Sequence, residues 1–428
     1  MTVERIVVVG AGAAGFRAAE RLRQLGFDGE VVMIGDEPRK PYHRPAVCKA
    51  LLCGSRKARD VTLEAAVELD VGWRLGTRAI GLDTARHAVL LPGGEEVGYD
   101  GLILATGGYP RSLPGAPRHD PRVRVLRTVE DAEGVQAALR TSRLPAVVVG
   151  GGFIGCEFAA SMRAMGREVI VVNNSAKLLH RFGDAIADAA GDLHAGHRVD
   201  TRSNARIRKW DTGRDGVGLH LDNGDVVFAA CVVLAVGSTP SVEWLRGSGL
   251  RVDDGVFCEP TLFAAGVDDV AVAGDIARWP NLRFDPVPRR VEHWITAVEG
   301  GRAAAENLLA GKWAAKPFTP LPRAWTSQFD VRVQHVGMPA LATDTVPLDA
   351  GVTGFVRAGN LVAVATWDRP HAMLDWTATL DRLLPVPTAG RRPRARPPRD
   401  GIPARVLIER HYASRHSFDG PNGIMTGQ

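Results

Sequence analysis

Short apolar runs alternate with amphipathic helical stretches along most of the chain, a pattern typical of an α/β fold. Ile6–Val9 consists of four β-branched residues and is followed by Arg17–Gly26, where Ala, Leu and Arg recur at helical spacing. The same order returns at Val147–Val149 and Glu157–Met165. We therefore predict two strand–turn–helix units, each with a buried strand at its start.

Each strand–helix turn carries the pattern Gly-x-Gly-x-x-Gly. The glycines are Gly10, Gly12 and Gly15 in the first turn and Gly150, Gly152 and Gly155 in the second. The first glycine of such a pattern permits a tight turn, the second lets a pyrophosphate approach the backbone, and the third lets helix and strand pack closely. The N–H groups and the positive dipole end of the helix then hold the phosphates. Two copies predict two dinucleotide sites; the alternative is a pair of glycine turns without a ligand.

Polar residues follow the second strand of each unit. Val31–Ile34 precedes Asp36 and Glu37, and an acid at this place accepts hydrogen bonds from an adenosine ribose. The alternative is that both acids belong to a solvated turn. Val169–Val172 instead ends at Asn173, which has no charge to repel a 2′-phosphate. NADH and NADPH both stay open, and we predict a preference shifted away from strict NADH use.

The rest of the chain divides into a return to the first unit, a third unit and a tail. Two further apolar strands are followed by small or acidic residues that suit a ligand site. Ala105, Thr106 and Gly107 follow Leu102–Leu104, and Gly274 and Asp275 follow Val270–Ala273. Residues 176–227 are expected to mix polar turns with short strands, and 294–309 to form a helix. Alternating short strands at 324–384 predict a small α+β unit, and the Pro- and Arg-rich residues beyond Pro385 predict a mobile tail.

The composition is that of an ordinary globular protein, with 45% apolar and 24% charged residues. The net charge of +5 reflects five arginines between Arg391 and Arg399, so we expect no nucleic-acid partner. No apolar run approaches the roughly 18–20 residues of a membrane span, and the chain enters a core strand by Ile6 without a signal peptide. The five cysteines form no metal-like cluster. We expect a cytoplasmic protein without a metal or a membrane partner.

Several motifs in one order make the chain similar to the FAD-dependent, NAD(P)H-linked ferredoxin reductases of oxygenase systems, the group of putidaredoxin reductase and the biphenyl dioxygenase reductases. The motifs are Pro41-Tyr-His-Arg-Pro with Lys49, Ala105-Thr-Gly, Leu126-Arg-Thr with Glu130-Asp131, Gly150-Gly-Gly-Phe-Ile-Gly-Cys-Glu157, Ala273-Gly-Asp275, Arg290-Val-Glu-His-Trp294 and Trp325-Thr-Ser-Gln-Phe. The resemblance covers roughly residues 4–384.

This resemblance implies an α/β, glutathione-reductase-like fold with two Rossmann-type dinucleotide-binding domains and a small α+β C-terminal domain. The implied boundaries are 1–112 and 241–316 for the FAD-binding domain, 113–240 for the NAD(P)-binding domain, 317–384 for the C-terminal domain and 385–428 for the basic tail. A monomer and a homodimer both stay open.

The resemblance also implies roles for single residues. Ala14 would contact the FAD pyrophosphate, Asp36 the adenosine ribose, and Lys49 the isoalloxazine, where a fixed cation favours the anionic reduced ring. Glu157 would approach the nicotinamide, and Trp325 would stand at the mouth of the flavin site. The further implied FAD contacts are Arg44, in the same motif as Lys49, together with Ala79, Arg127, Asp275 and Trp294.

Cys48 and Cys53 raise an alternative chemistry. Their spacing resembles that of the redox cysteines in glutathione-reductase-like enzymes, and Lys49 or a helix N-terminus would lower the pKa of the Cys48 thiol. Cys48 nevertheless stands within a motif of the ferredoxin reductases, where many relatives have a serine. We predict that Cys48 does no redox work.

The implied function is a flavoprotein reductase that takes a hydride from NADH or NADPH onto FAD and passes electrons to a small iron–sulfur ferredoxin. That ferredoxin would serve a cytochrome P450 or another oxygenase. One alternative is a flavin-dependent oxidase or thiol–disulfide oxidoreductase that acts on a small molecule. The other is a non-catalytic flavin-binding scaffold.

Overall fold

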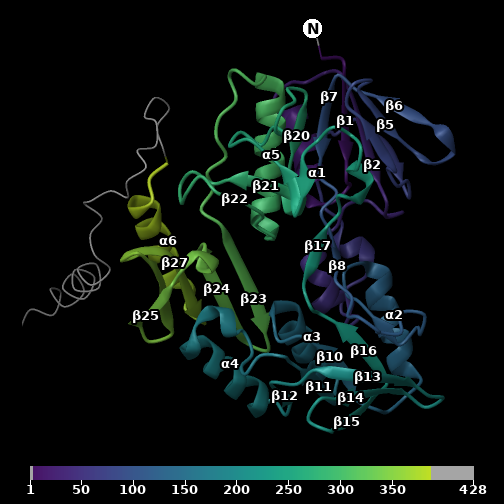
Figure 1. Cartoon of the computed structure of the whole chain (residues 1–428), viewed down its shortest axis with the longest axis vertical. Coiled ribbons are helices and arrows are strands. Elements are labelled where there is room, and N and C mark those ends of the chain that lie inside the picture. Colours follow the sequence, from purple (N-terminus) through teal and green to yellow (C-terminus); the bar gives the residue numbers. More distant parts are fainter. Residues whose placement is uncertain (1–2, 387–428) are drawn as a thin grey trace, which may run out of the picture.

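The computed structural model describes residues 3–386 of the 428-residue chain. The predicted mobile tail lies outside the described residues from residue 387 onward. Two five-stranded parallel sheets occupy the upper and lower parts of Figure 1, and a five-stranded antiparallel sheet lies beside them. Within residues 3–386, the structure contains no helix with the length and apolarity that a membrane span requires.

The first parallel sheet has the strand order β20-β7-β1-β2-β3. Its strands are β1 (Arg5–Val9), β2 (Glu30–Gly35), β3 (Gly72–Leu75), β7 (Gly101–Leu104) and β20 (Val270–Val272). Helices α1 (Ala13–Gln24) and α5 (Trp294–Ala310) pack against each other over this sheet. The predicted return of the chain is correct, because β20 pairs with β7.

The second parallel sheet has the order β12-β11-β10-β16-β9. Its strands are β9 (Val123–Arg124), β10 (Ala146–Val149), β11 (Val169–Val172), β12 (Asp200–Arg202) and β16 (Cys231–Leu234). Helices α2 (Val129–Arg140) and α3 (Phe153–Ala164) follow β9 and β10. Both α1 and α3 begin directly after a glycine, ahead of the predicted starts at Arg17 and Glu157, because the glycine turn itself feeds the first helical turn.

Helix α4 was not predicted from the sequence pattern. Residues 176–227 were expected to hold polar turns and short strands, but α4 spans Asp184–Gly196. Its buried side chains are Ile186, Ala187, Ala190 and His194, which recur at the three- to four-residue spacing of one helical face. Three small or polar residues among those four made the stripe weak in the sequence.

Antiparallel strands complete the two parallel units and connect them. The strands β8 (Gly108–Pro110) and β17 (Ser238–Pro240) pair where the chain leaves the first unit and returns to it. Three further small sheets are present. Two are antiparallel meanders, β4 (Gly81–Asp83), β5 (Ala88–Leu90) and β6 (Glu96–Gly98), and β13 (Ile207–Thr212), β14 (Val217–Leu221) and β15 (Val226–Ala229). The third is a mixed sheet of β18 (Val252–Asp253), β19 (Gly255–Phe257), β21 (Ala277–Pro280) and β22 (Pro288–Arg289).

The C-terminal unit is a five-stranded antiparallel sheet with one helix. Its strands, in sheet order, are β23 (Arg323–Gln328), β24 (Val331–Gly337), β27 (Asn360–Trp367), β26 (Val352–Arg357) and β25 (Asp344–Asp349), and its helix is α6 (Pro370–Leu383). In Figure 1, β23 reaches down toward α3. The predicted α/β class, with two Rossmann-type units and a small α+β unit, is confirmed.

The third glycine of each turn sets the distance between helix and strand. A Cβ on Gly15 would lie 2.0 Å from the carbonyl oxygen of Gly10, and one on Gly155 would lie 1.8 Å from that of Gly150. Such contacts are far inside van der Waals distance, so α1 and α3 lie against their strands only because these positions have no side chain.

We therefore predict that Gly155→Ala destabilises the protein by more than about 3 kcal/mol, because backbone must move to admit the methyl group. Gly191→Ala is the matched control, since a Cβ at this α4 position meets nothing within 4 Å and alanine favours helix by about 1 kcal/mol. Chemical denaturation measures both variants. Equal stability of Gly155→Ala and the wild type would contradict the prediction, because it would show that the turn accommodates a methyl group.

Candidate functional site

A cavity of about 1450 Å³ runs along the carboxyl ends of the central strands of both parallel sheets. The strand-end residues that line it are Val9, Ile34, Val149, Val172 and Leu234. Open α/β sheets bind their ligands at this edge. Since a pocket for one small ligand usually has roughly 300–1000 Å³, this cavity has room for more than one.

Two helix N-termini face this cavity with their N–H groups uncapped. The N-cap residues are Gly12 of α1 and Gly152 of α3, and neither helix has a side-chain cap or an acidic residue in its first turn. Both glycines line the cavity, and a Cβ on either would meet nothing within 4 Å. Unpaired N–H groups and a positive dipole end beside open space fit the pyrophosphate of a dinucleotide at each helix.

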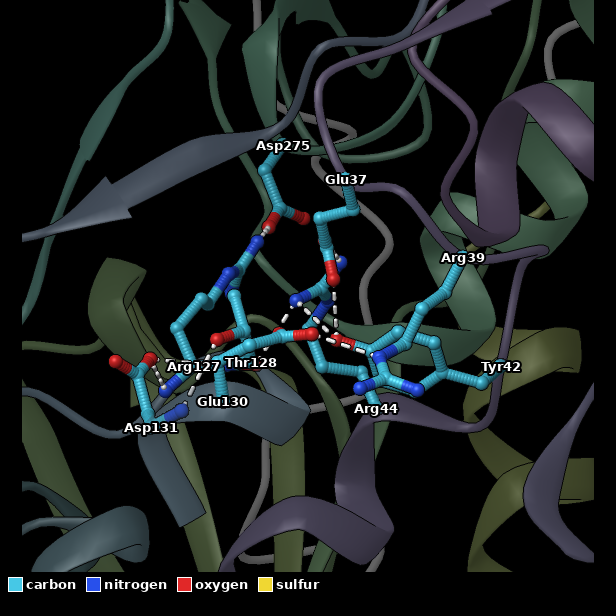
Figure 2. A network of polar contacts seen from close by, with 9 residues as sticks. All are labelled: Glu37, Arg39, Tyr42, Arg44, Arg127, Thr128, Glu130, Asp131 and Asp275. Atoms are coloured by element: carbon cyan, nitrogen blue, oxygen red, sulfur yellow. Dashed lines mark hydrogen bonds and ion pairs between the residues drawn. The ribbon is translucent and has the colours of Figure 1, made fainter. Parts of the chain in front are cut away.

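The two acids after β2 have different environments. Asp36 is exposed at the cavity edge and makes no hydrogen bond or ion pair with another described residue. Glu37 accepts hydrogen bonds from Tyr42 Oη and Arg44 Nη2, each at 2.6 Å (Figure 2). Arg44 Nη1 also donates to the carbonyl oxygen of Arg127 at 2.8 Å. Glu37 thus orients Arg44, while Asp36 is the acid available to a ribose.

Arg127 and Asp275 meet across the cavity wall, with 3.4 Å between Arg127 Nη2 and Asp275 Oδ2 (Figure 2). The backbone of Arg127 is fixed by helix α2, because Asp131 Oδ2 accepts the N–H groups of Arg127 and Thr128, both at 2.8 Å. Thr128 Oγ1 in turn accepts the N–H of Asp131, which completes a capping box. A cation and an anion are thereby held at the predicted flavin side of the cavity.

A partly buried ion pair joins the loop after β2 to helix α3. Lys49 lies on a π-helical turn, Val47–Leu51, and its Nζ is 2.7 Å from Glu157 Oε1 on α3. Glu157 Oε2 accepts a hydrogen bond from Cys48 Sγ at 3.0 Å. The Glu157 side chain is only 4% exposed, whereas that of Lys49 is 29% exposed. All three side chains line the cavity, so Lys49 and Glu157, for which the resemblance implies roles beside the flavin and the nicotinamide, are brought together.

Burial raises the pKa of the Cys48 thiol well above its ordinary value, and the neighbouring Glu157 carboxylate raises it further. The lowered pKa on which the thiol–disulfide alternative depends is therefore not found. All five cysteines are free, and Cys53 Sγ instead lies 3.9 Å from the carbonyl oxygen of Ser161. Cys48 is a hydrogen-bond donor to Glu157 rather than a thiolate.

On the second unit, Asn173 is buried, and its Nδ2 donates to the carbonyl oxygens of Ser175 and Lys177, both at 3.0 Å. Its amide donors therefore shape the loop instead of being available to a ribose. Lys177 pairs with acidic residues of α4. Exposed Arg181 and Arg206 line the same end of the cavity. Sequence reasoning missed Arg206 because it comes from the β12–β13 connection, distant in the chain from β11.

The remaining predicted residues also surround the cavity. They are Gly10, Ala14, Ala79, Ala105, Thr106, Gly107, Gly150, Gly274, Trp294 and Trp325. Gly15 and Gly155 do not line it; they serve helix–strand packing. Among residues 3–386, no three His, Cys, Asp or Glu side chains cluster as a metal site would require.

Comparisons with known proteins agree with this geometry. A family model described as pyridine nucleotide-disulphide oxidoreductase matches residues 4–301. A ferredoxin–NAD(+) reductase component of the anthranilate 1,2-dioxygenase system from Burkholderia cepacia is 34% identical over 357 residues, 81% of this chain and 85% of the relative. A ferredoxin–NAD(P)(+) reductase from Sphingomonas is 28% identical over 373 residues, 84% of this chain and 88% of the relative.

A solved structure gives the same picture. The reductase in a covalent putidaredoxin reductase–putidaredoxin complex superposes with a TM-score of 0.82 at 27% identity, and the match covers 89% of this chain and 94% of that one. The resemblance proposed from the sequence motifs is confirmed, and so is the glutathione-reductase-like fold.

We predict that Cys48→Ser keeps NAD(P)H-dependent electron transfer within about threefold of the wild-type rate, because a serine hydroxyl can donate the same hydrogen bond to Glu157. Turnover with an artificial acceptor and the visible spectrum of the bound flavin measure this. Loss of turnover with FAD still bound, together with a long-wavelength charge-transfer band in the reduced wild type, would instead favour the thiol enzyme.

Proposed function

Because the chain belongs to the pyridine nucleotide-disulphide oxidoreductase family, we propose that it is an FAD-dependent NAD(P)H:ferredoxin oxidoreductase serving a cytochrome P450 or another oxygenase. The observation that carries the proposal is the partly buried Lys49–Glu157 pair, which lines the same cavity as two uncapped helix N-termini. One helix end suits each dinucleotide, and the pair lies where the two would meet.

The first unit would hold FAD. Gly12 and Ala14 offer the α1 N-terminus to the pyrophosphate, and Asp36 offers a carboxylate to the adenosine ribose. When bound, FAD supplies the chemistry that accepts a hydride from NAD(P)H and releases single electrons to an iron–sulfur acceptor. Lys49 places a fixed positive charge beside the isoalloxazine site, which favours added negative charge there.

The second unit would hold NAD(P)H. Gly152 offers the α3 N-terminus to its pyrophosphate, and Glu157 faces the nicotinamide end of the cavity. Trp325 supports a ferredoxin as the electron acceptor. It lines the cavity, and the guanidinium of exposed Arg332 lies 5.2 Å from its ring centroid. A cation at that mouth favours an acidic ferredoxin as partner.

The alternatives gain no comparable support. A thiol–disulfide function would need a reactive thiolate, and the Cys48 thiol is buried against a carboxylate with a raised pKa. A pure scaffold would not need the Lys49–Glu157 pair at the cavity. The sheets support the proposed boundaries of 1–112, 113–240, 241–316 and 317–384. Five free cysteines support a reducing compartment, and we propose the cytoplasm.

The first test of this function is anaerobic reduction. We expect purified protein to be yellow and to bleach within seconds after NADH or NADPH is added. Lys49→Met should keep FAD but bleach roughly a hundredfold more slowly, because a fixed charge beside the reacting ring is lost. Lys312→Met, which changes a lysine paired with Glu259 and Asp268 away from the cavity, is the control. A wild type that binds FAD but bleaches with neither nucleotide would refute the reductase.

The second test concerns the nucleotide. We predict that kcat/KM for NADPH lies within a hundredfold of that for NADH, a difference below ~2.7 kcal/mol. The Arg181→Ala, Arg206→Ala double variant should lose roughly tenfold with NADPH and less with NADH, because only NADPH carries the extra phosphate. Lys177→Ala is the control, since Asp184 and Asp188 already pair that ammonium. An NADH preference above a hundredfold would contradict the prediction.

A further inference from the structure

Two donors of the C-terminal unit also bind the Glu157 carboxylate, on the side that faces away from the cavity. Thr326 Oγ1 donates to Glu157 Oε1 at 2.8 Å, and the backbone N–H of Ser327 donates to the same oxygen at 3.2 Å. Neither residue lines the cavity, and the Thr326 side chain is fully buried. Lys49 therefore approaches Oε1 from the cavity while two groups of β23 approach it from the protein interior.

These contacts continue into a chain of buried hydrogen bonds. Gln328 Nε2 lies 3.3 Å from Thr326 Oγ1, and Gln328 Oε1 lies 2.9 Å from His194 Nε2 on α4. Thr326, Gln328 and His194 each have 0% exposure. Thr326 and Gln328 share one face of β23 because they are two residues apart in a strand. This series of hydrogen bonds thus runs from α4 through β23 to α3 and ends at Lys49.

The Glu157 carboxylate, at one end of this series of hydrogen bonds, determines which group donates and which accepts in each bond. A carboxylate can only accept, so the Thr326 hydroxyl donates to Glu157 and must accept from the amide nitrogen of Gln328. That leaves Gln328 Oε1 to accept from His194, which must carry its proton on Nε2. Burial lowers the pKa of His194, in agreement with a neutral ring, and its Nδ1 has no partner among residues 3–386.

We propose that Thr326, Gln328 and His194 are positioning residues that fix the Glu157 carboxylate, and through it the Lys49 ammonium, at the hydride-transfer site. The inference rests on the proposed function, which places that pair between the two nucleotides. Without the Thr326 donor, the carboxylate would be held by the backbone N–H of Ser327 alone on its interior side and could rotate toward Lys49. Hydrogen bonds to a charged group in a dry interior are the strong ones, so this loss is large.

The same sheet provides a matched control for the Thr326 hydroxyl. Thr366 on β27 is also fully buried, but its Oγ1 has no hydrogen-bond partner within the described residues. Replacing either threonine by valine removes a hydroxyl and keeps the branched shape. A difference between the two variants therefore reports the hydrogen bond to Glu157 and not the loss of a buried polar group in general.

The experiment compares Thr326→Val, Thr326→Ser and Thr366→Val as FAD-loaded proteins. We expect anaerobic single-turnover reduction by NADH to slow by roughly tenfold in Thr326→Val, to return within about threefold in Thr326→Ser, and to stay at the wild-type rate in Thr366→Val. Equal rates in Thr326→Val and Thr366→Val would overturn the proposal. A wild type that is not reduced at all would instead refute the proposed function.

A second variant tests the chain without touching Glu157 or its direct donors. Gln328→Leu removes the acceptor for His194, so the histidine ring-nitrogen chemical shifts should change from an Nε2-protonated ring in the wild type to a mixture of tautomers. This readout needs neither FAD nor turnover, and it stands even if Thr326→Val does not fold. A wild-type His194 protonated on Nδ1, or a tautomer unaffected by Gln328→Leu, would refute the chain.

Discussion

A buried carboxylate must be paired, and Glu157 satisfies this constraint with donors from two distant parts of the chain. Its side chain is 4% exposed, so the unpaired charge would cost several kcal/mol. Lys49 and Cys48 come from the loop after β2, and Thr326 comes from the C-terminal sheet. Each unit therefore needs the others to be in place before this charge can be buried, and the cavity between them acquires its shape from that requirement.

The helix N-termini impose the opposite condition, since their donors are left without partners. Gly12 and Gly152 provide no side-chain cap, and no acid stands in either first turn. A protein optimised only for stability would cap these ends, because a good cap contributes about 1 kcal/mol. The uncapped ends make sense as sites whose partner is an anionic ligand. The two uncapped helix ends thus lower the stability of the protein beside the cavity, whereas the donors around Glu157 stabilise the carboxylate that lines the same cavity.

The sequence predicted well whatever depends on local pattern. Glycine spacing and β-branched runs located the central strands of both parallel sheets, the glycine turns and both helix starts to within four residues, because those features follow from neighbouring residues. The uses of Glu37 and Asn173 were not predictable in this way. Glu37 orients Arg44, and Asn173 holds its own loop, and both depend on residues that the fold alone brings near. Arg206 stands in no motif, and the motif that contains Thr326 does not indicate its contact with Glu157.

Cys48 shows why a residue's chemistry has to be derived from its surroundings. A lysine beside it in the sequence suggested an activated thiolate, since a nearby cation lowers a thiol pKa. In the fold, however, Lys49 pairs with Glu157, and the same carboxylate faces Cys48 Sγ at 3.0 Å. A negatively charged group therefore lies within hydrogen-bond distance of the sulfur in a dry environment. The neutral thiol is the stable form, and the hydrogen bond that it donates is one of the four contacts that hold the Glu157 side chain in place.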